Sequence, residues 1–232
     1  MKYKAIIFDV SDTLVKYSPN YAQIYGDRLR KVGYEISNEK AVEISIAVNL
    51  AIGDEDRRKN ISIEKSTNVN IETIMDKAAL SCVASYVNGS ILEELSRISI
   101  PSQKMEVIPG VLKVLETLRI RYRLAIVSNH YTWLKEKLVE LGLAKYFEAI
   151  VISEIVGVSK PDIRIMKIAL QELLLEAENC LYVGDQPNDV LCAKSAGMDC
   201  ALITTSKSSM PAYIPYKEDY KIIAIEELLD FL

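Results

Sequence analysis

Residues 5–13 read Ala-Ile-Ile-Phe-Asp-Val-Ser-Asp-Thr, a short apolar run that ends in small polar and acidic residues. Four further apolar runs have the length of a β-strand, at residues 124–127, 149–152, 181–183 and 201–203. Most of the five runs are continuously apolar rather than alternating, which is typical of strands covered on both faces. These segments therefore predict a sheet that is buried on both sides.

Segments with helical spacing of apolar residues lie between the runs. Apolar stripes occur over residues 111–118, 134–141 and 165–174, and Pro161 predicts the first turn of the third helix. A short strand over residues 221–223 and a helix over 226–231 end the chain. This alternation of strands and helices predicts an α/β fold with a doubly wound, Rossmann-like parallel sheet.

The stretch from residue 16 to residue 104 breaks that alternation. It predicts four helices, over residues 21–31, 39–51, 71–86 and 91–96, with the mixed-charge tract 53–65 separating the second from the third. We therefore expect a sheet domain of residues 1–15 and 105–232, with a helical domain of residues 16–104 inserted into it. An insertion after the first strand lies at the carboxyl edge of the sheet, where it can cover a site.

Composition excludes several classes of protein. Of the 232 residues, 50% are apolar and 26% are charged, which favours a packed core over disorder. The net charge of −4 shows no basic excess for binding nucleic acid. Apolar stretches are too short for a membrane span, and the N-terminus does not resemble a signal peptide. Four cysteines without a C-x-x-C pair predict free thiols, and together these features predict a cytoplasmic protein.

Each predicted strand is followed by polar or charged residues. In open parallel sheets ligands bind beyond the carboxyl ends of the strands, so we expect these side chains to share one edge. The residues are Asp9, Ser11 and Thr13 after the first run, Ser128 and Asn129 after the second, Lys160 after the third, and Asp185 and Asp189 after the fourth.

The order and spacing of these residues resemble the haloacid dehalogenase superfamily. Asp9 to Thr13 matches its first motif, Ser128 the second, Lys160 the third, and Gly184-Asp185-x-x-x-Asp189 the fourth. The helical insertion resembles the α-helical cap of the phosphoglycolate-phosphatase-like branch. The resemblance covers essentially the whole chain and implies a hydrolase that acts on a small anionic substrate.

The resemblance also implies a role for each residue. Asp9 is the nucleophile that forms an aspartyl phosphate, and Lys160 supplies positive charge to it and to the phosphoryl oxygens. Thr13, Ser128 and Asn129 contact the substrate. The metal is Mg²⁺, which prefers oxygen ligands. Its expected ligands are the carboxylates of Asp9 and Asp185 and the main-chain carbonyl of Ser11, with Asp189 as a ligand or as the residue that orients water or Asp185.

Phosphatases of this family usually have a second aspartate two residues after the nucleophile, and it acts as general acid and base. In this sequence that position is Ser11. Three hypotheses follow. The first is a Mg²⁺-dependent phosphatase or phosphotransferase, slow with poor leaving groups, which the Gly184–Asp185 pair favours. The second is a 2-haloacid dehalogenase-like hydrolase, which needs no metal. The third is a non-catalytic binding protein whose cap closes on a ligand.

Overall fold

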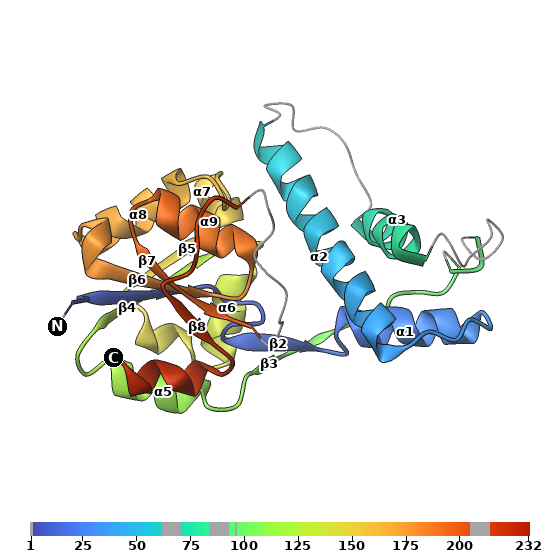
Figure 1. The fold of residues 1–232 in the computed structure, drawn as a ribbon, viewed down its shortest axis with the longest axis horizontal. Helices are drawn as coiled ribbons and strands as arrows, with labels where there is room; N and C mark the ends of the chain where they lie inside the picture. Colours follow the sequence, from blue (N-terminus) through green and yellow to red (C-terminus); the bar gives the residue numbers. More distant parts are fainter. Residues whose placement is uncertain (1, 62–70, 84–92, 96, 205–213) are drawn as a thin grey trace. The chain divides into compact units, whose positions relative to one another are not determined.

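The chain divides into two compact units. The computed structural model describes residues 2–61, 71–83, 93–95, 97–204 and 214–232 (Figure 1). One unit consists of Met1–Lys16 with Glu106–Leu232, and the other is Tyr17–Met105. Both points at which the chain passes from one unit to the other lie within short strands, β2 (Val15–Ser18) and β3 (Lys104–Val107), which form a two-stranded sheet.

Six parallel strands form the sheet of the first unit, in the order β5-β4-β1-β6-β7-β8. They are β1 (Ala5–Phe8), β4 (Arg123–Ser128), β5 (Ala149–Ile152), β6 (Cys180–Gly184), β7 (Asp199–Ile203) and β8 (Tyr220–Ile222). All residues of β1 and β6 are buried, because helices cover both faces of the sheet. The predicted doubly wound parallel sheet is confirmed.

Helices lie on both faces of this sheet (Figure 1). On one face are α8 (Arg164–Leu173) and α9 (Pro187–Ser195), which contact the strands on either side of β1. On the other are α5 (Val111–Leu118) and the 3-10 helix η3 (Ile225–Asp230), which contact each other. The remaining helical segments of this unit are α6 (Leu134–Glu140), α7 (Ser153–Val156), η1 (Ala144–Tyr146) and η2 (Ala177–Asn179).

The second unit contains α1 (Tyr21–Lys31), α2 (Asn38–Ile61) and α3 (Ile71–Val83), with α2 in contact with the other two. Helix α1 begins at a capping box, in which the side chains of Asn20 and Gln23 each accept a hydrogen bond from the other's main-chain N–H. The apolar side chains that α1, α2 and α3 bury form a core of their own.

The predicted end of one helix and the predicted place of Pro161 are wrong, whereas α1 and α5 have their predicted bounds. Helix α2 continues through Gly53 to Ile61, because charged residues are good helix formers and one glycine costs only about 1 kcal/mol. Helix α8 begins at Arg164, so Pro161 lies in the turn before it rather than in its first turn. The final helix is a 3-10 helix. The predicted helices 71–86 and 91–96 are described as helix over 71–83 and 93–95, and their other residues lie outside the described part of the chain.

The structure also bears on two expectations from composition. The described part of the chain holds no helix that is both long and apolar enough to cross a bilayer. All four cysteines are free thiols, and Cys180, Cys192 and Cys200 are buried.

Candidate active site

The carboxyl ends of β1, β4 and β6 position the site. Strand β1 lies between β4 and β6 in the sheet, and Asp9 directly follows β1. Ser128 is the last residue of β4, and Asp185 directly follows β6. Because the three strands are parallel neighbours, residues distant in sequence meet at one edge of the sheet.

Three carboxylates meet at this edge. Asp9, Asp185 and Asp189 each offer an oxygen, and these oxygens lie within 4.8 Å of one another. Asp9 and Asp189 are buried, whereas Asp185 is partly exposed. Three ionised carboxylates at this separation repel one another, and a bound proton or a nearby cation reduces that repulsion.

Lys160 provides a cation that contacts two of the three carboxylates. Its buried ammonium group donates hydrogen bonds to Asp9 Oδ1 at 2.7 Å, Asp189 Oδ1 at 2.6 Å and the hydroxyl of Tyr182 at 2.9 Å. Burial lowers the pKa of Lys160, but the charges of Asp189 and Asp9 outweigh this effect and hold the pKa above its usual range. Lys160 is therefore charged at neutral pH.

One lysine does not neutralise three carboxylates. Burial raises the pKa of Asp9 to about 6, even though the charge of Lys160 lowers it. Burial, followed by the charges of Asp189 and Asp9, raises the pKa of Asp185 well above its usual value. Carboxylates in such surroundings favour a bound cation, and oxygen donors are the ligands that Mg²⁺ prefers. Asp9 and Asp185 thus fit the predicted metal.

Asp189 is committed to contacts with the protein. Its Oδ2 atom accepts hydrogen bonds from the main-chain N–H groups of Asp185 at 3.1 Å and Gln186 at 3.0 Å. Its Oδ1 atom accepts the hydrogen bond from Lys160. Helix α9 begins at Pro187, which places Asp189 in its first turn, beside the N–H groups of the preceding loop. These contacts suit a residue that holds Lys160 and the Asp185 loop in place.

The remaining predicted residues lie around this cluster. Thr13 is buried, and its hydroxyl donates to Asp185 Oδ1 at 3.4 Å. Asn129 contacts both sides of the Lys160 main chain: its Oδ1 accepts from Lys160 N at 2.7 Å, and its Nδ2 donates to Lys160 O at 3.0 Å. Among the described residues, the hydrogen bonds that join the cluster do not include the side chains of Ser11 or Ser128. The substrate contacts of Thr13, Ser128 and Asn129 stay predictions.

Tyr182 was missed in the sequence because it lies within an apolar strand. It is fully buried in β6, and its hydroxyl contacts Lys160 and Asp189 and donates to the main-chain oxygen of Val127 at 2.9 Å. A buried tyrosine usually has a hydrogen-bond partner for its hydroxyl. A tyrosine two residues before Gly184-Asp185 was therefore a signal that could have been used.

The fold and site together define an α/β protein with a carboxylate–lysine centre at the edge of a parallel sheet. Residues 6–203 match the family of haloacid dehalogenase-like hydrolases. The chain belongs to this family, which confirms the resemblance found in the sequence.

Curated relatives of similar length carry the names of phosphatases. The chain is 28% identical to a glyceraldehyde 3-phosphate phosphatase of Methanothermobacter thermautotrophicus, covering 87% of this chain and 86% of the relative. It is 26% identical to the protein of that name from Methanocaldococcus jannaschii, covering 99% and 96%. A shorter match, 55% of this chain and 46% of the relative at 33% identity, is to phosphoglycolate phosphatase 1 of Pseudomonas aeruginosa.

Solved structures show the same fold. The L-2-haloacid dehalogenase RSc1362 superposes with a TM-score of 0.70 at 17% identity, covering 100% of this chain and 99% of that one. A phosphatase of this family from Thermococcus onnurineus gives 0.58 at 23% identity, covering 98% and 96%. Phosphatases and dehalogenases thus share this architecture, and the choice between them rests on the site.

Proposed function

We propose that the protein is a Mg²⁺-dependent phosphatase that hydrolyses a small phosphate ester through an aspartyl phosphate on Asp9. The observation that carries this proposal is the pairing of Asp9 with Asp185 beside a fixed Lys160. A nucleophile that attacks carbon to displace a halide needs no second acidic group next to it. A nucleophile that attacks an anionic phosphoryl group needs a divalent cation, and Asp185 can help to bind one.

Bound Mg²⁺ would supply charge neutralisation between Asp9 and the phosphoryl oxygens, held by the carboxylates of Asp9 and Asp185 and the main-chain oxygen of Ser11. In the first step an oxygen of Asp9 attacks phosphorus, and the bond from phosphorus to the ester oxygen breaks. The leaving alkoxide takes a proton from water. In the second step water attacks phosphorus and gives up a proton to solvent, the bond to Asp9 breaks, and inorganic phosphate leaves. Lys160 stabilises the negative charge that develops in both steps.

A serine at position 11 makes both proton transfers slower. General acid–base catalysis contributes about 10²–10⁴-fold to rate, and a serine hydroxyl is a poor proton donor at neutral pH. We therefore expect higher turnover with esters whose leaving group is already a weak base. The names of the relatives support a small phosphorylated metabolite as the class of substrate. We further propose that Tyr17–Met105 acts as the cap and the other unit as the catalytic core.

The test is the release of p-nitrophenol from p-nitrophenyl phosphate, with and without Mg²⁺. We expect activity that depends on Mg²⁺, that a chelator abolishes and that Asp9→Asn abolishes. Asp199→Asn is the matched control, because it makes the same chemical change to a partly buried aspartate in β7 that belongs to a separate network of charged residues. Equal activity in Asp9→Asn and the native protein would rule out the proposal.

Two other outcomes support the alternatives. Release of halide from 2-chloropropionate without metal would assign the protein to the dehalogenases. No turnover of any phosphate ester, together with a melting temperature that phosphate analogues raise, would indicate a binding protein.

A further inference from the structure

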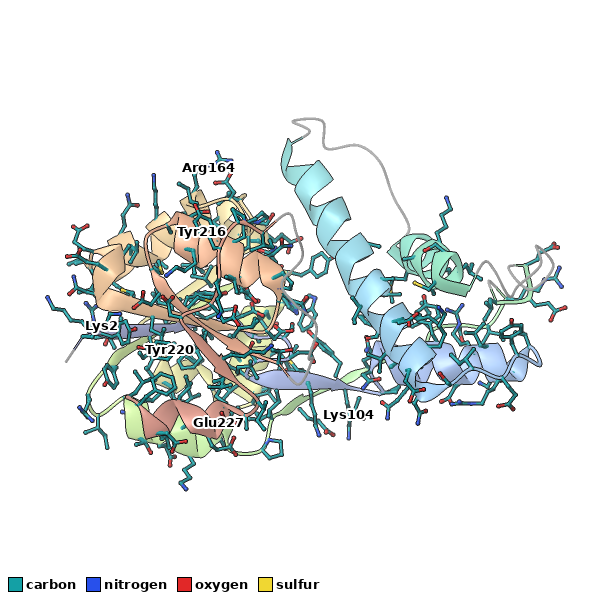
Figure 2. All side chains as sticks on the ribbon, viewed as in Figure 1. Lys2, Lys104, Arg164, Tyr216, Tyr220 and Glu227 are labelled. Atoms are coloured by element: carbon teal, nitrogen blue, oxygen red, sulfur yellow. The ribbon has the colours of Figure 1, made fainter. Side chains whose placement is uncertain are left out.

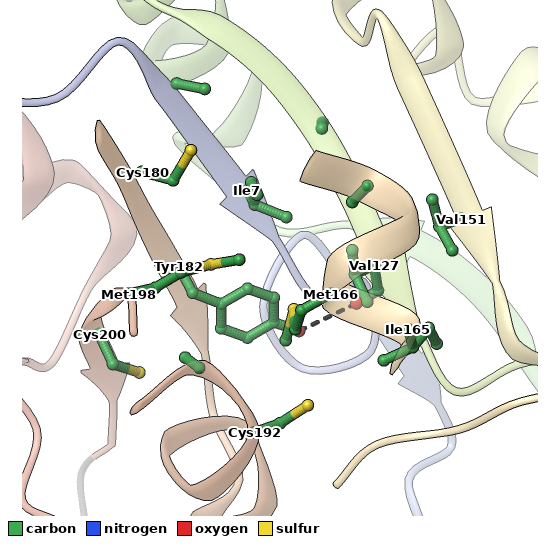
Figure 3. Close-up of a cluster of buried hydrophobic side chains, with 14 of the residues drawn as sticks. Ile7, Val127, Val151, Ile165, Met166, Cys180, Tyr182, Cys192, Met198 and Cys200 are labelled. Atoms are coloured by element: carbon green, nitrogen blue, oxygen red, sulfur yellow. Dashed lines mark hydrogen bonds between the residues drawn. The ribbon is translucent and has the colours of Figure 1, made fainter. Parts of the chain in front are cut away.

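Tyr182 joins the apolar core to the catalytic edge of the sheet. Its ring lies among buried side chains that include Met166 of α8, Cys192 of α9 and Met198, which directly precedes β7 (Figure 3). Its hydroxyl is buried with the ring and contacts the Lys160 ammonium. The Lys160 nitrogen is 2.9 Å from the hydroxyl oxygen but 5.5 Å from the ring centroid, so it lies beyond the hydroxyl and not over the ring face.

The directions of the hydrogen bonds follow from the chemistry of the groups. An ammonium group has three N–H donors and no acceptor, so the Tyr182 oxygen accepts from Lys160. The proton of Tyr182 is then available to the main-chain oxygen of Val127, the contact drawn in Figure 3, or to Asp189 Oδ1 at 3.2 Å. Each of the three Lys160 donors thus has one acceptor, and the acceptors come from β6, from α9 and from the residue after β1.

We infer that Tyr182 is a positioning residue, which fixes the Lys160 ammonium so that one N–H keeps pointing at Asp9 and at the phosphoryl group that Asp9 receives. This inference rests on the proposed function. When Asp9 is phosphorylated, the contact between Asp9 and Lys160 changes, whereas the contacts with Tyr182 and Asp189 do not take part in the reaction. Tyr182 and Asp189 are therefore the two acceptors that keep the Lys160 ammonium in place throughout the reaction. Without the hydroxyl, only Asp189 remains, and the ammonium can turn toward it.

The variant Tyr182→Phe removes the hydroxyl and keeps the ring in the core. We expect kcat for p-nitrophenyl phosphate to fall about tenfold, because a misplaced or unsatisfied buried donor loses about that much transition-state stabilisation. KM should stay within about twofold, since Tyr182 is fully buried and out of reach of a substrate. Tyr122→Phe is the matched control. It also removes the hydroxyl of a buried tyrosine, which donates to a main-chain oxygen, that of Leu232, and it should leave kcat unchanged.

A second readout follows Lys160 without any catalysis. In nitrogen-15 spectra of lysine-labelled protein, the Lys160 ammonium should give a resonance protected from exchange with water, assigned by its loss in Lys160→Met. Tyr182→Phe should abolish this protection, and Tyr122→Phe should keep it. A native kcat and a protected resonance in Tyr182→Phe would overturn the inference.

The two readouts also separate this inference from the proposed function. If the native enzyme hydrolyses no phosphate ester, the proposed function fails. The exchange of the Lys160 ammonium protons with water then decides alone whether Tyr182 holds Lys160. If Tyr182→Phe does not fold, the native spectrum decides: a protected ammonium supports the inference, and a rapidly exchanging one contradicts it.

Discussion

At Gly184 the space for a side chain is already occupied by Asp189. A Cβ atom at this position would lie 2.4 Å from Asp189 Oδ2 and 2.7 Å from its Cβ. Gly184→Ala must therefore displace the carboxylate that holds both Lys160 and the Asp185 loop. We expect a loss of about 1–3 kcal/mol in the free energy of unfolding and a fall in kcat of about tenfold or more.

Gly142→Ala is the control for this substitution. A Cβ at Gly142 meets no atom within 4 Å, and the cost there comes from a left-handed backbone with φ of +69°. We expect a loss of about 1–2 kcal/mol with unchanged kcat. Denaturant unfolding and steady-state kinetics on both variants separate a general loss of stability from a displaced Asp189. Full activity in folded Gly184→Ala would contradict this account.

Ser11 permits a gain-of-function test. Ser11→Asp places a carboxyl group two residues beyond Asp9, where it can serve as a proton donor and acceptor. We expect turnover of alkyl phosphates to rise, by as much as about 10²-fold, with a smaller rise for p-nitrophenyl phosphate because its leaving group needs little protonation. A folded Ser11→Asp variant without any increase would show that Ser11 does not limit the rate.

A largely buried ion pair, Arg28 with Asp76, joins helices α1 and α3. Arg28 of α1 is 3% exposed, and its guanidinium donates to both carboxylate oxygens of Asp76 and to the main-chain oxygen of Leu95. Arg28→Ala leaves Asp76 partly buried without its cation, which costs about 3–5 kcal/mol. We expect hydrogen exchange in α1 and α3 to accelerate.

Arg30→Ala in the same helix is the control. Arg30 pairs with Asp27 in solvent, with 46% of its side chain exposed, and its removal should cost less than about 1 kcal/mol. Similar exchange rates in the two variants would mean that the buried pair does not hold the helices together.

The sequence predicted the strands of the six-stranded sheet, and the bounds of α1 and α5, more closely than the end of α2. The strands β1 and β4–β8 lie within two residues of their predicted ranges. For the strands inside the sheet this is because burial on both faces requires uninterrupted apolar runs, whereas the edge strand β8 has an exposed lysine. The end of α2 was misplaced, because charged residues are compatible with both helix and loop. Strands β2 and β3 were missed, since four residues with one buried side chain carry little signal.

The charged residues of the site were likewise more predictable than the buried residue that holds Lys160 in place. Asp9, Lys160 and Asp185 follow strands and match spaced motifs, so their meeting at one edge could be expected. The hydroxyl of Tyr182 reaches the site from inside the core, and its partners depend on how α9 packs on β6. Neither the period of apolar residues nor motif spacing contains that information.

For the whole molecule, the crowded carboxylates make stability depend on pH and metal together. The folded-state pKa of Asp9 is raised to about 6, and that of Asp185 is raised well above normal, both chiefly by burial. A raised carboxyl pKa means that the folded state binds the proton more tightly than the unfolded state. This contribution to stability is present below pH 4, near the unfolded pKa, and is lost as pH rises through about 6.

Mg²⁺ should restore that stability because it takes the place of the protons. We expect the melting temperature of the metal-free protein to rise on adding Mg²⁺ far more at about pH 7.5 than at about pH 5, where protons compete with the cation. At a Mg²⁺ concentration of about 100 Kd the gain is about 2.7 kcal/mol. Asp185→Asn should lose most of the Mg²⁺ response. Asp199→Asn should keep it, because Asp199 contacts Tyr3, Lys194 and Lys2, the last of which is labelled in Figure 2.

The single histidine acts on stability in the opposite direction. Burial lowers the pKa of His130, so its contribution is lost as pH falls below its unfolded value, and this slope is common to the native protein and Asp185→Asn. The difference between these two proteins therefore isolates the carboxylates. Calorimetry at both pH values, with and without Mg²⁺, measures it. An equal Mg²⁺ response in Asp185→Asn and the native protein would place the cation elsewhere and remove the electrostatic basis for phosphoryl transfer at Asp9.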